Sequence, residues 1–181
     1  MTHDFGDDFA FSSTARADAL VRRACHRLVL DCCGVSRANA QEDRGGVDYW
    51  VSTHRGRVGL DLKLRRKDFA AARPSIDCVI ELDGYGSSGW LLKPGGAYLL
   101  LFACMDTQRV AMFRKPELQA AVVVNLSRWL VQGQAKEINT QSERDGRSWK
   151  NRAVVISGEL LTSAIDRLDS FGLAANDGGG A

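Results

Sequence analysis

Asp61 and Lys63 are two residues apart in a segment of alternating apolar and polar side chains, Arg57–Arg65 (RVGLDLKLR). Residues two apart on a β-strand point to the same face, so the carboxylate and the ammonium share a face. The polar row consists of Arg57, Asp61, Lys63 and Arg65, and the opposite row that must face a core consists of Val58, Leu60, Leu62 and Leu64. An acid beside a lysine has the chemistry needed to hold a metal ion and to position a water or a phosphate.

A second carboxylate, Asp48, lies in the preceding alternating segment, Val47–Thr53 (VDYWVST). The short connection His54-Arg55-Gly56 predicts a hairpin between the two segments, which brings Asp48 close to Asp61. Two such acids repel each other unless a cation joins them. Carboxylates and backbone carbonyls suit Mg²⁺, so we expect metal ligation by Asp48, Asp61 and the carbonyl of Leu62. Lys63 is then expected to hold the attacking water or to stabilise charge on the scissile phosphate.

Asp48, followed by Asp61-Leu62-Lys63 across a hairpin and preceded by a helix, resembles the signature of the PD-(D/E)XK nuclease superfamily. The lead-in at 43–48 (DRGGVD) is similar to that of phage- and mobile-element-type members, and by organisation the resemblance spans residues 15–168. The resemblance implies a restriction-endonuclease-like core and Mg²⁺-dependent cleavage of phosphodiester bonds, with Mn²⁺ as a substitute metal. It also implies a nucleic-acid substrate, with DNA favoured over RNA.

The chain departs from the family pattern in two places. Many members supply another acid from the first helix, where this chain offers only Asp18 and Asp31, and the second motif acid is Asp61 in place of the commoner Glu. These departures keep a second hypothesis open. In that hypothesis the chain has a nuclease-like fold without catalytic activity, and it binds nucleic acid or inhibits another protein.

Other residues are expected to support the site. Glu81 is the first candidate to complete the acidic cluster, with Asp77 and Asp83 as competitors for the role. The basic residues around the second strand are expected to contact phosphate, and they are Arg57, Arg65, Arg66 and Lys67. The polar stretch at 132–150 is either a basic clamp for nucleic acid or, in the simpler interpretation, a mobile surface loop.

Each pattern also has a plain structural interpretation. Asp61 and Lys63 fit an ordinary exposed strand face, on which ion pairs contribute little to stability. The basic segment fits an edge strand that discourages aggregation. Trp50, Trp90 and Trp129 each lie among apolar residues, so we interpret them as core packing and assign them no binding role.

The elements that must position these residues predict one α/β domain. Helical periodicity predicts helices over 14–32, 116–129 and 160–168. Alternation and apolar runs predict strands over 47–53, 57–65, 76–82, 97–104, 109–114 and 152–157. This order predicts a mixed central β-sheet flanked by helices. The domain is expected to span 14–170, between a loose segment at 1–13 and a flexible Gly-rich tail at 171–181.

Composition narrows the class of protein further. A chain of 181 residues suits one core, and its net charge of +2 does not by itself indicate a nucleic-acid binder. The five cysteines have no paired CxxC elements and no neighbouring histidine cluster, which predicts buried, reduced thiols and no zinc site. An acidic start and the absence of a long apolar run predict a cytoplasmic protein without a membrane segment. The oligomeric state stays open, with a homodimer among the alternatives.

Overall fold

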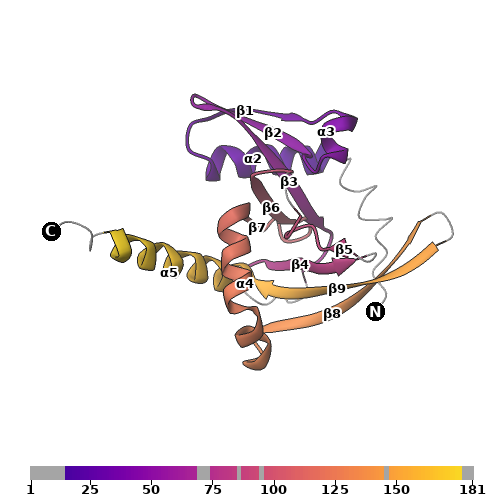
Figure 1. Cartoon of the computed structure of the whole chain (residues 1–181). Coiled ribbons are helices and arrows are strands. Elements are labelled where there is room, and N and C mark those ends of the chain that lie inside the picture. The colour runs from indigo at the N-terminus through magenta and orange to yellow at the C-terminus, as the bar shows by residue number, and fades with distance from the viewer. Residues whose placement is uncertain (1–14, 69–73, 85–86, 94–95, 145–146, 177–181) are drawn as a thin grey trace.

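Two β-sheets, with helices packed against them, organise the chain (Figure 1). The computed structural model describes residues 15–68, 74–84, 87–93, 96–144 and 147–176. The first sheet has the order β1-β2-β3-β6-β7 and the second β5-β4-β9-β8. The first sheet consists of β1 (Cys32–Arg37), β2 (Tyr49–Thr53), β3 (Gly56–Arg65), β6 (Leu99–Cys104) and β7 (Val110–Arg114), and the second of β4 (Asp77–Gly84), β5 (Ser87–Ser88), β8 (Ala135–Arg144) and β9 (Arg147–Ser157). The helices are α2 (Ala15–Leu28), α3 (Ala40–Arg44), α4 (Lys115–Val131) and α5 (Gly158–Asn176).

The first sheet is mixed, because β3 and β6 run parallel while the other neighbouring strands are antiparallel. Helix α2 packs against one face of this sheet. Its buried side chains Val21, Ala24 and Cys25 share a core with Tyr49, Val51 and Leu60, while Val58 and Leu62 pack against the same core. The leucine-rich face of β3 therefore faces a core, as its alternation predicts.

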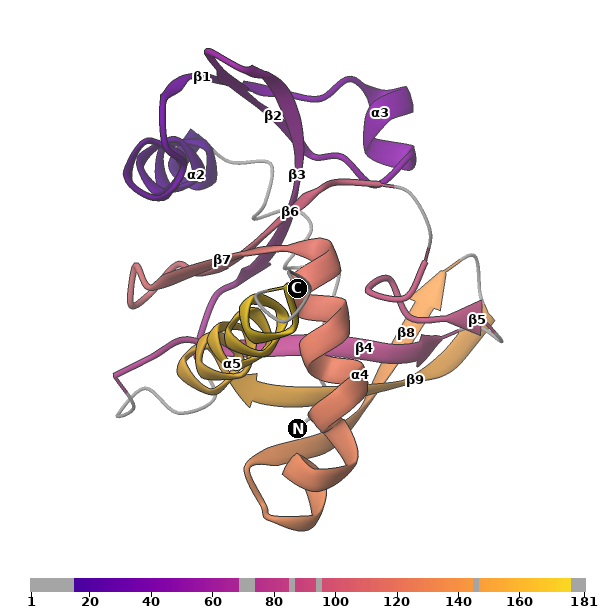
Figure 2. The same cartoon turned by 60° about the vertical axis from the view of Figure 1, so that its left-hand side comes forward.

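A second core fills the space on the other side of β6, whose six residues are all buried. Leu99 and Leu101 face α2, whereas Leu100, Phe102 and Cys104 pack with residues of α4, α5 and the second sheet. Figure 2 shows α4 and α5 lying against β4 and β9. A strand covered on both faces needs a continuous apolar sequence, which is what the run Leu99–Cys104 supplies.

The expected fold class is confirmed: the chain is α/β, with a mixed sheet flanked by helices. The structure divides the strands between two sheets, since β4 and β9 pair with each other and not with β3 or β6. The helix expected to reach residue 32 ends at Leu28, and a turn with a positive φ of 59° at Asp31 leads into β1. The short helix α3 was not predicted. Asn39 caps it, and Glu42 completes a capping box.

Residues 132–150 are not the irregular loop that the sequence predicted. Most of them belong to β8 and β9, which form a long antiparallel hairpin. Polar residues on both faces of these strands hide the alternation that would have identified them. The side chains at 140–150 lie outside the described part of the chain, so the basic clamp stays a prediction. The segment 1–13 also lies outside it, and α5 continues to Asn176, past the domain end expected at residue 170.

The free cysteines divide into buried and accessible ones. Cys25, Cys78 and Cys104 are buried as expected, but Cys33 is exposed where the β1–β2 register shifts between Cys32 and Gly34. Burial, with the nearby Cys32, raises the pKa of Cys25 to about 12, so this thiol stays protonated and unreactive. Across the described ranges, no helix is both long and apolar enough to cross a membrane.

Candidate active site

Asp61 and Lys63 lie in the middle of β3, on the face opposite α2. The register places them beside Leu100 and Phe102 of β6, whose side chains belong to the second core. Lys63 Nζ lies 2.8 Å from Asp61 Oδ2, and the two side chains are 27% and 15% exposed, respectively. The interpretation as an ordinary exposed strand face is therefore wrong for this pair. A pair this shielded from water interacts more strongly than a surface ion pair.

Asp48 adjoins this pair from the end of the neighbouring strand. The β2–β3 ladder ends at the pair of Tyr49 and Leu60, and the Asp48 N–H donates to the Leu60 carbonyl at 2.9 Å. The Asp48 carboxylate then accepts a hydrogen bond of 2.7 Å from the Leu62 N–H. The N–H and C=O of one residue in an extended strand point to the same side. The Leu62 carbonyl therefore lies on the edge of β3 that Asp48 occupies.

Burial and the neighbouring Asp61 dominate the electrostatics of Asp48. Burial, followed by repulsion from Asp61, raises the pKa of Asp48 to about 7, and Asp43 of α3 contributes in the same direction. The Leu62 N–H and Lys63 oppose this rise, but they do not cancel it. A divalent cation between the two carboxylates would remove the repulsion and favour the ionised form of both.

The donor set fits Mg²⁺ in type. Two carboxylates and one backbone carbonyl are oxygen ligands of the kind that Mg²⁺ prefers, with water and substrate oxygens completing the shell. In the described residues no group of three or more His, Cys, Asp or Glu side chains is placed to hold a metal ion. Asp48, Asp61 and the Leu62 carbonyl would supply only part of a Mg²⁺ shell, and water or substrate oxygens would have to supply the rest.

Trp90 lies beneath the lysine of the pair. Lys63 Nζ is 4.5 Å from the centroid of the Trp90 ring, and this ring packs against Phe102 with centroids 6.1 Å apart. A cation over an indole face is attracted by the ring and held in place. The core interpretation of Trp90 is incomplete, because this side chain packs in the core and also positions Lys63.

Gly89 brings Trp90 close to strand β4. A Cβ added at Gly89 would lie 1.9 Å from the carbonyl oxygen of Glu81, so only glycine fits there. The Gly89 N–H donates to the Leu82 carbonyl at 3.0 Å. This hydrogen bond holds the turn before Trp90 against β4. The contact of Trp90 with Lys63 then links β4 to the candidate site on β3.

Glu81 lies within electrostatic range of Lys63, as the expectation of a supporting acid requires. Burial raises the pKa of Glu81, while Lys63 and then Lys93 lower it and the nearby Asp83 raises it. The pairing of β4 with β9 shifts register between Glu81 and Asp83. Bulges of this kind re-aim side chains and are common beside active sites.

Lys115 is a site residue that sequence reasoning missed. It is the first residue of α4, and its Nζ donates a hydrogen bond of 2.8 Å to the Lys93 carbonyl. Burial lowers the pKa of Lys115, while attraction to Asp61 raises it and repulsion from Lys63 lowers it. A second ammonium therefore lies near the acid of the motif. No local sequence signal marks it, because residues 61 and 115 meet only through the pairing of β3 with β6 and β7.

Asp18, the acid in helix α2, does not belong to the site. Asp18 Oδ1 accepts hydrogen bonds from the Tyr49 hydroxyl at 2.7 Å and from Arg37 Nε at 2.8 Å. Tyr49 lies in the core under α2, so Asp18 is on the opposite side of the sheet from Asp61. Asp43 of α3, in the lead-in DRGGVD, is the additional acid that influences Asp48.

The four predicted phosphate contacts lie in different environments. Arg66 and Lys67 are exposed just beyond the end of β3. Arg65 is half-buried, with one guanidinium nitrogen shielded from water, and it lies within electrostatic range of the buried Cys78. Arg57 is exposed on the hairpin, with its guanidinium carbon 4.1 Å from the centroid of the Trp50 ring.

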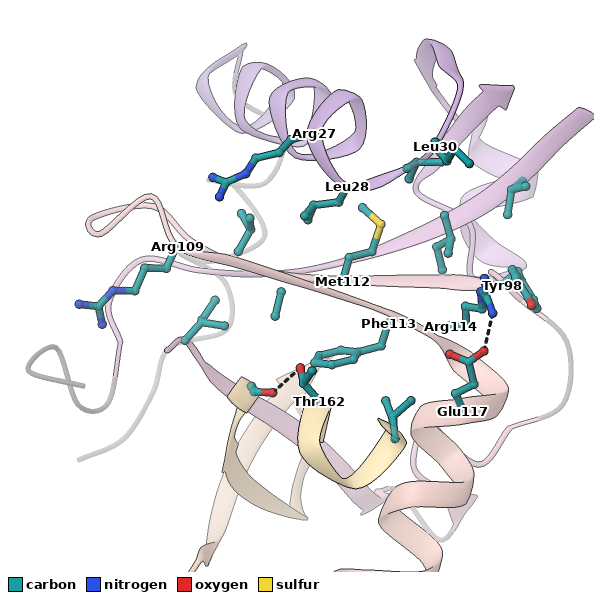
Figure 3. A pocket seen from close by; sticks show the side chains of 18 of the residues that line it. Arg27, Leu28, Leu30, Tyr98, Arg109, Met112, Phe113, Arg114, Glu117 and Thr162 are labelled. Carbon is teal, nitrogen blue, oxygen red and sulfur yellow. Dashed lines mark hydrogen bonds and ion pairs between the residues drawn. The ribbon is translucent and has the colours of Figure 1, made fainter. Parts of the chain in front are cut away.

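A pocket of about 1070 Å³ lies elsewhere, between strand β7, the end of α2 and the start of α5 (Figure 3). Its lining is largely apolar and includes Leu28, Leu30 and Met112, with Arg27 and Arg109 at its margin. Asp48, Asp61 and Lys63 do not line it. The acid and base that meet in its lining, Glu117 and Arg114, already form an ion pair of 2.7 Å with each other, so this hollow is a weaker catalytic candidate than the polar site on β3.

Comparison of the chain with protein-family models, with curated proteins and with solved structures found no match.

Proposed function

We propose that this protein is a Mg²⁺-dependent nuclease that hydrolyses phosphodiester bonds in nucleic acid, with DNA favoured as the substrate. The observation that carries the proposal is the hydrogen bond from the Leu62 N–H to Asp48, because Leu62 separates Asp61 from Lys63. This hydrogen bond places the Asp48 carboxylate beside the segment of β3 that carries Asp61, the Leu62 carbonyl and Lys63. The resemblance of the motif to PD-(D/E)XK nucleases supports the same assignment.

Each residue has a task in this proposal. Asp48, Asp61 and the Leu62 carbonyl would hold Mg²⁺, with Mn²⁺ as a substitute. When bound, the ion supplies Lewis-acid polarisation of a phosphate oxygen and a coordinated water of lowered pKa. Lys63, held by Asp61 and by the Trp90 ring, donates a hydrogen bond that orients the attacking water. Lys115 offers a second positive charge for the phosphate oxygens as negative charge develops on them.

The experiment is a cleavage assay on single- and double-stranded DNA and RNA, with Mg²⁺, with Mn²⁺ and with EDTA. We expect cleavage by the wild type that requires the metal and that Asp61→Ala and Asp61→Asn abolish. Asp31→Asn is the matched control, because Asp31 is an exposed acid at a positive φ that asparagine also tolerates. If the wild type cleaves none of the substrates, or if Asp61→Asn cleaves as well as the wild type, the proposal fails.

A second candidate function is a nuclease-like fold that binds nucleic acid or another protein without cleaving. Two observations favour it: the described residues include no group of three or more metal-ligating side chains, and Asp18 is engaged on the other side of the sheet. The same assay separates the two functions. A wild type that binds oligonucleotides but does not cleave them, and whose thermal stability is insensitive to Mg²⁺ and Mn²⁺, would support binding alone.

A further inference from the structure

The face of β1, β2 and β3 opposite α2 carries a tryptophan covered by an exposed arginine. Trp50 and Arg57 lie on this face, because their neighbours Tyr49, Val51 and Leu60 all point into the core under α2. Four positions beside Trp50 carry small residues, and these are Gly34, Ser36, Ser52 and Gly59, of which Gly59 is covered by the Val47 side chain. The core interpretation of Trp50 is therefore wrong: this side chain is half-buried beneath an arginine and belongs to none of the hydrophobic clusters.

The Arg57 guanidinium lies over the Trp50 ring, with its central carbon 4.1 Å from the ring centroid. Glu42 of α3, which accepts a hydrogen bond from the Asn39 N–H, lies within electrostatic range of the Arg57 guanidinium. The pKa of Glu42 lies below its ordinary value, first because of the Asn39 backbone N–H and then because of the Trp50 indole and the Arg57 charge. A guanidinium that lies over an indole ring leaves its outer side available to a further planar group.

This pair is continuous with the candidate active site. Trp50 is paired with Gly59, so Arg57 and Asp61 are its two diagonal neighbours on β3. Arg57 and Asp61 are four residues apart on one strand, which corresponds to roughly 13 Å. The Val47 side chain covers Gly59 between them, so a nucleic-acid strand with one phosphate at Asp61 would pass beside Val47 to reach Trp50 and Arg57.

We propose that Arg57, supported by Trp50, is a stacking platform for an unpaired base, and that the substrate presents single-stranded nucleotides to the site. The proposal rests on the proposed function, since the platform lies on the path to Asp61. Unpaired bases stack on aromatic rings and on guanidinium planes, and such stacking tolerates any base sequence. Bases inside a duplex are stacked on each other and are not available to the platform.

The test is a set of binding measurements by fluorescence anisotropy in EDTA, where no cleavage occurs. The probes are a short labelled single-stranded DNA, the same strand with abasic sites in place of its bases, and the matching duplex. The protein variants are the wild type, Arg57→Lys and Arg57→Ala. Lysine keeps the positive charge but has no planar guanidinium on which a base could stack. Arg22→Ala is the control, because Arg22 is an exposed arginine on α2, on the other side of the sheet.

We expect the wild type to bind the intact single strand at least about fivefold more tightly than the abasic strand or the duplex. Arg57→Lys and Arg57→Ala should both remove most of this difference, and Arg22→Ala should retain it. Equal binding of intact and abasic strands by the wild type would overturn the platform, as would an Arg57→Lys variant that keeps the full difference. A wild type that binds none of the probes would overturn it as well. Because these measurements need no metal, their failure is distinguishable from loss of the Asp61-dependent cleavage.

Discussion

The Asp48 carboxylate accepts a hydrogen bond of 2.7 Å from the backbone N–H of Leu62, across 14 residues of sequence. This bond replaces the next rung of the β2–β3 ladder, which ends at Tyr49 and Leu60. It holds one carboxylate at the strand edge between Asp61 and Lys63. The consequence is a site whose acids belong to two neighbouring segments and whose geometry depends on the hairpin that joins them.

Replacing Lys63 by methionine should remove turnover and leave the fold intact. The side chain is 27% exposed and its replacement opens no buried cavity, but it leaves Asp61 without its ion-pair partner, so we expect the free energy of unfolding to fall by about 1–3 kcal/mol. The cleavage rate should fall by about 100-fold or more, because a charged group at the reacting phosphate is lost. Denaturant unfolding and single-turnover cleavage measure the two effects. A variant that no longer folds would show that Lys63 is structural.

Replacing Asp18 by asparagine should lower the stability of the protein and leave cleavage unchanged. Asp18 accepts hydrogen bonds from Tyr49 and Arg37 on the α2 side of the sheet, and we expect the loss of charge to cost about 1 kcal/mol of stability. Metal-dependent cleavage should be unchanged. Thermal unfolding and cleavage assays with Tyr49→Phe as a companion variant check this. A selective loss of cleavage in Asp18→Asn would place this acid in the site after all.

Alanine at Gly89 should damage both stability and the site. Its Cβ would lie 1.9 Å from the Glu81 carbonyl oxygen, and such overpacking costs about 1–3 kcal/mol. The displaced turn would move Trp90 away from Lys63, so cleavage should fall even where the protein is fully folded. Gly133→Ala is the matched control. An alanine at position 133 would be strained by the φ of +66°, although its Cβ would meet no other atom. This variant should destabilise the protein without a loss of cleavage per folded molecule.

The metal-free protein should lose stability as the pH rises from about 4 to about 7. Burial, followed by repulsion from Asp61, raises the pKa of Asp48 from 3.8 to about 7, so the folded state holds a proton that the unfolded state has already released. The stabilising contribution of this proton is fully present below pH 3.8 and is lost as the pH passes through about 7. In EDTA, Asp48→Asn should flatten this part of the curve of unfolding free energy against pH. Parallel curves for the variant and the wild type would contradict this origin.

The hairpin and the shared face of Asp61 and Lys63 could be predicted because strand alternation is a local signal with a period of two residues. The environment of that face could not be predicted. The partial burial of Asp61 and Lys63 depends on what covers the neighbouring β6, and its apolar run shows that it is covered on both faces but not by which elements. The alternation of a strand determines which side chains share a face, and tertiary packing determines whether that face is exposed to solvent.

Lys115 and Trp50 are two further residues whose environment was not predicted from the sequence. Lys115 follows β7 at the start of α4 and reaches Asp61 only through strand pairing, so no spacing in the sequence marks it. Trp50 lies between Tyr49 and Val51, which favoured a core position, yet strand alternation puts its side chain on the opposite face from theirs. For Trp50 the period of two residues was the better guide, and the apolar character of its neighbours was misleading.

The most direct measurement of the central claim is the anomalous difference density of crystals soaked with Mn²⁺. We predict one peak between the carboxylates of Asp48 and Asp61 and in contact with the Leu62 carbonyl, with metal–oxygen distances of about 2.1 Å. The peak should be absent in Asp61→Asn crystals soaked in the same way. A well-soaked crystal of the wild type without density at this position, or with its metal bound away from both carboxylates, would contradict the account.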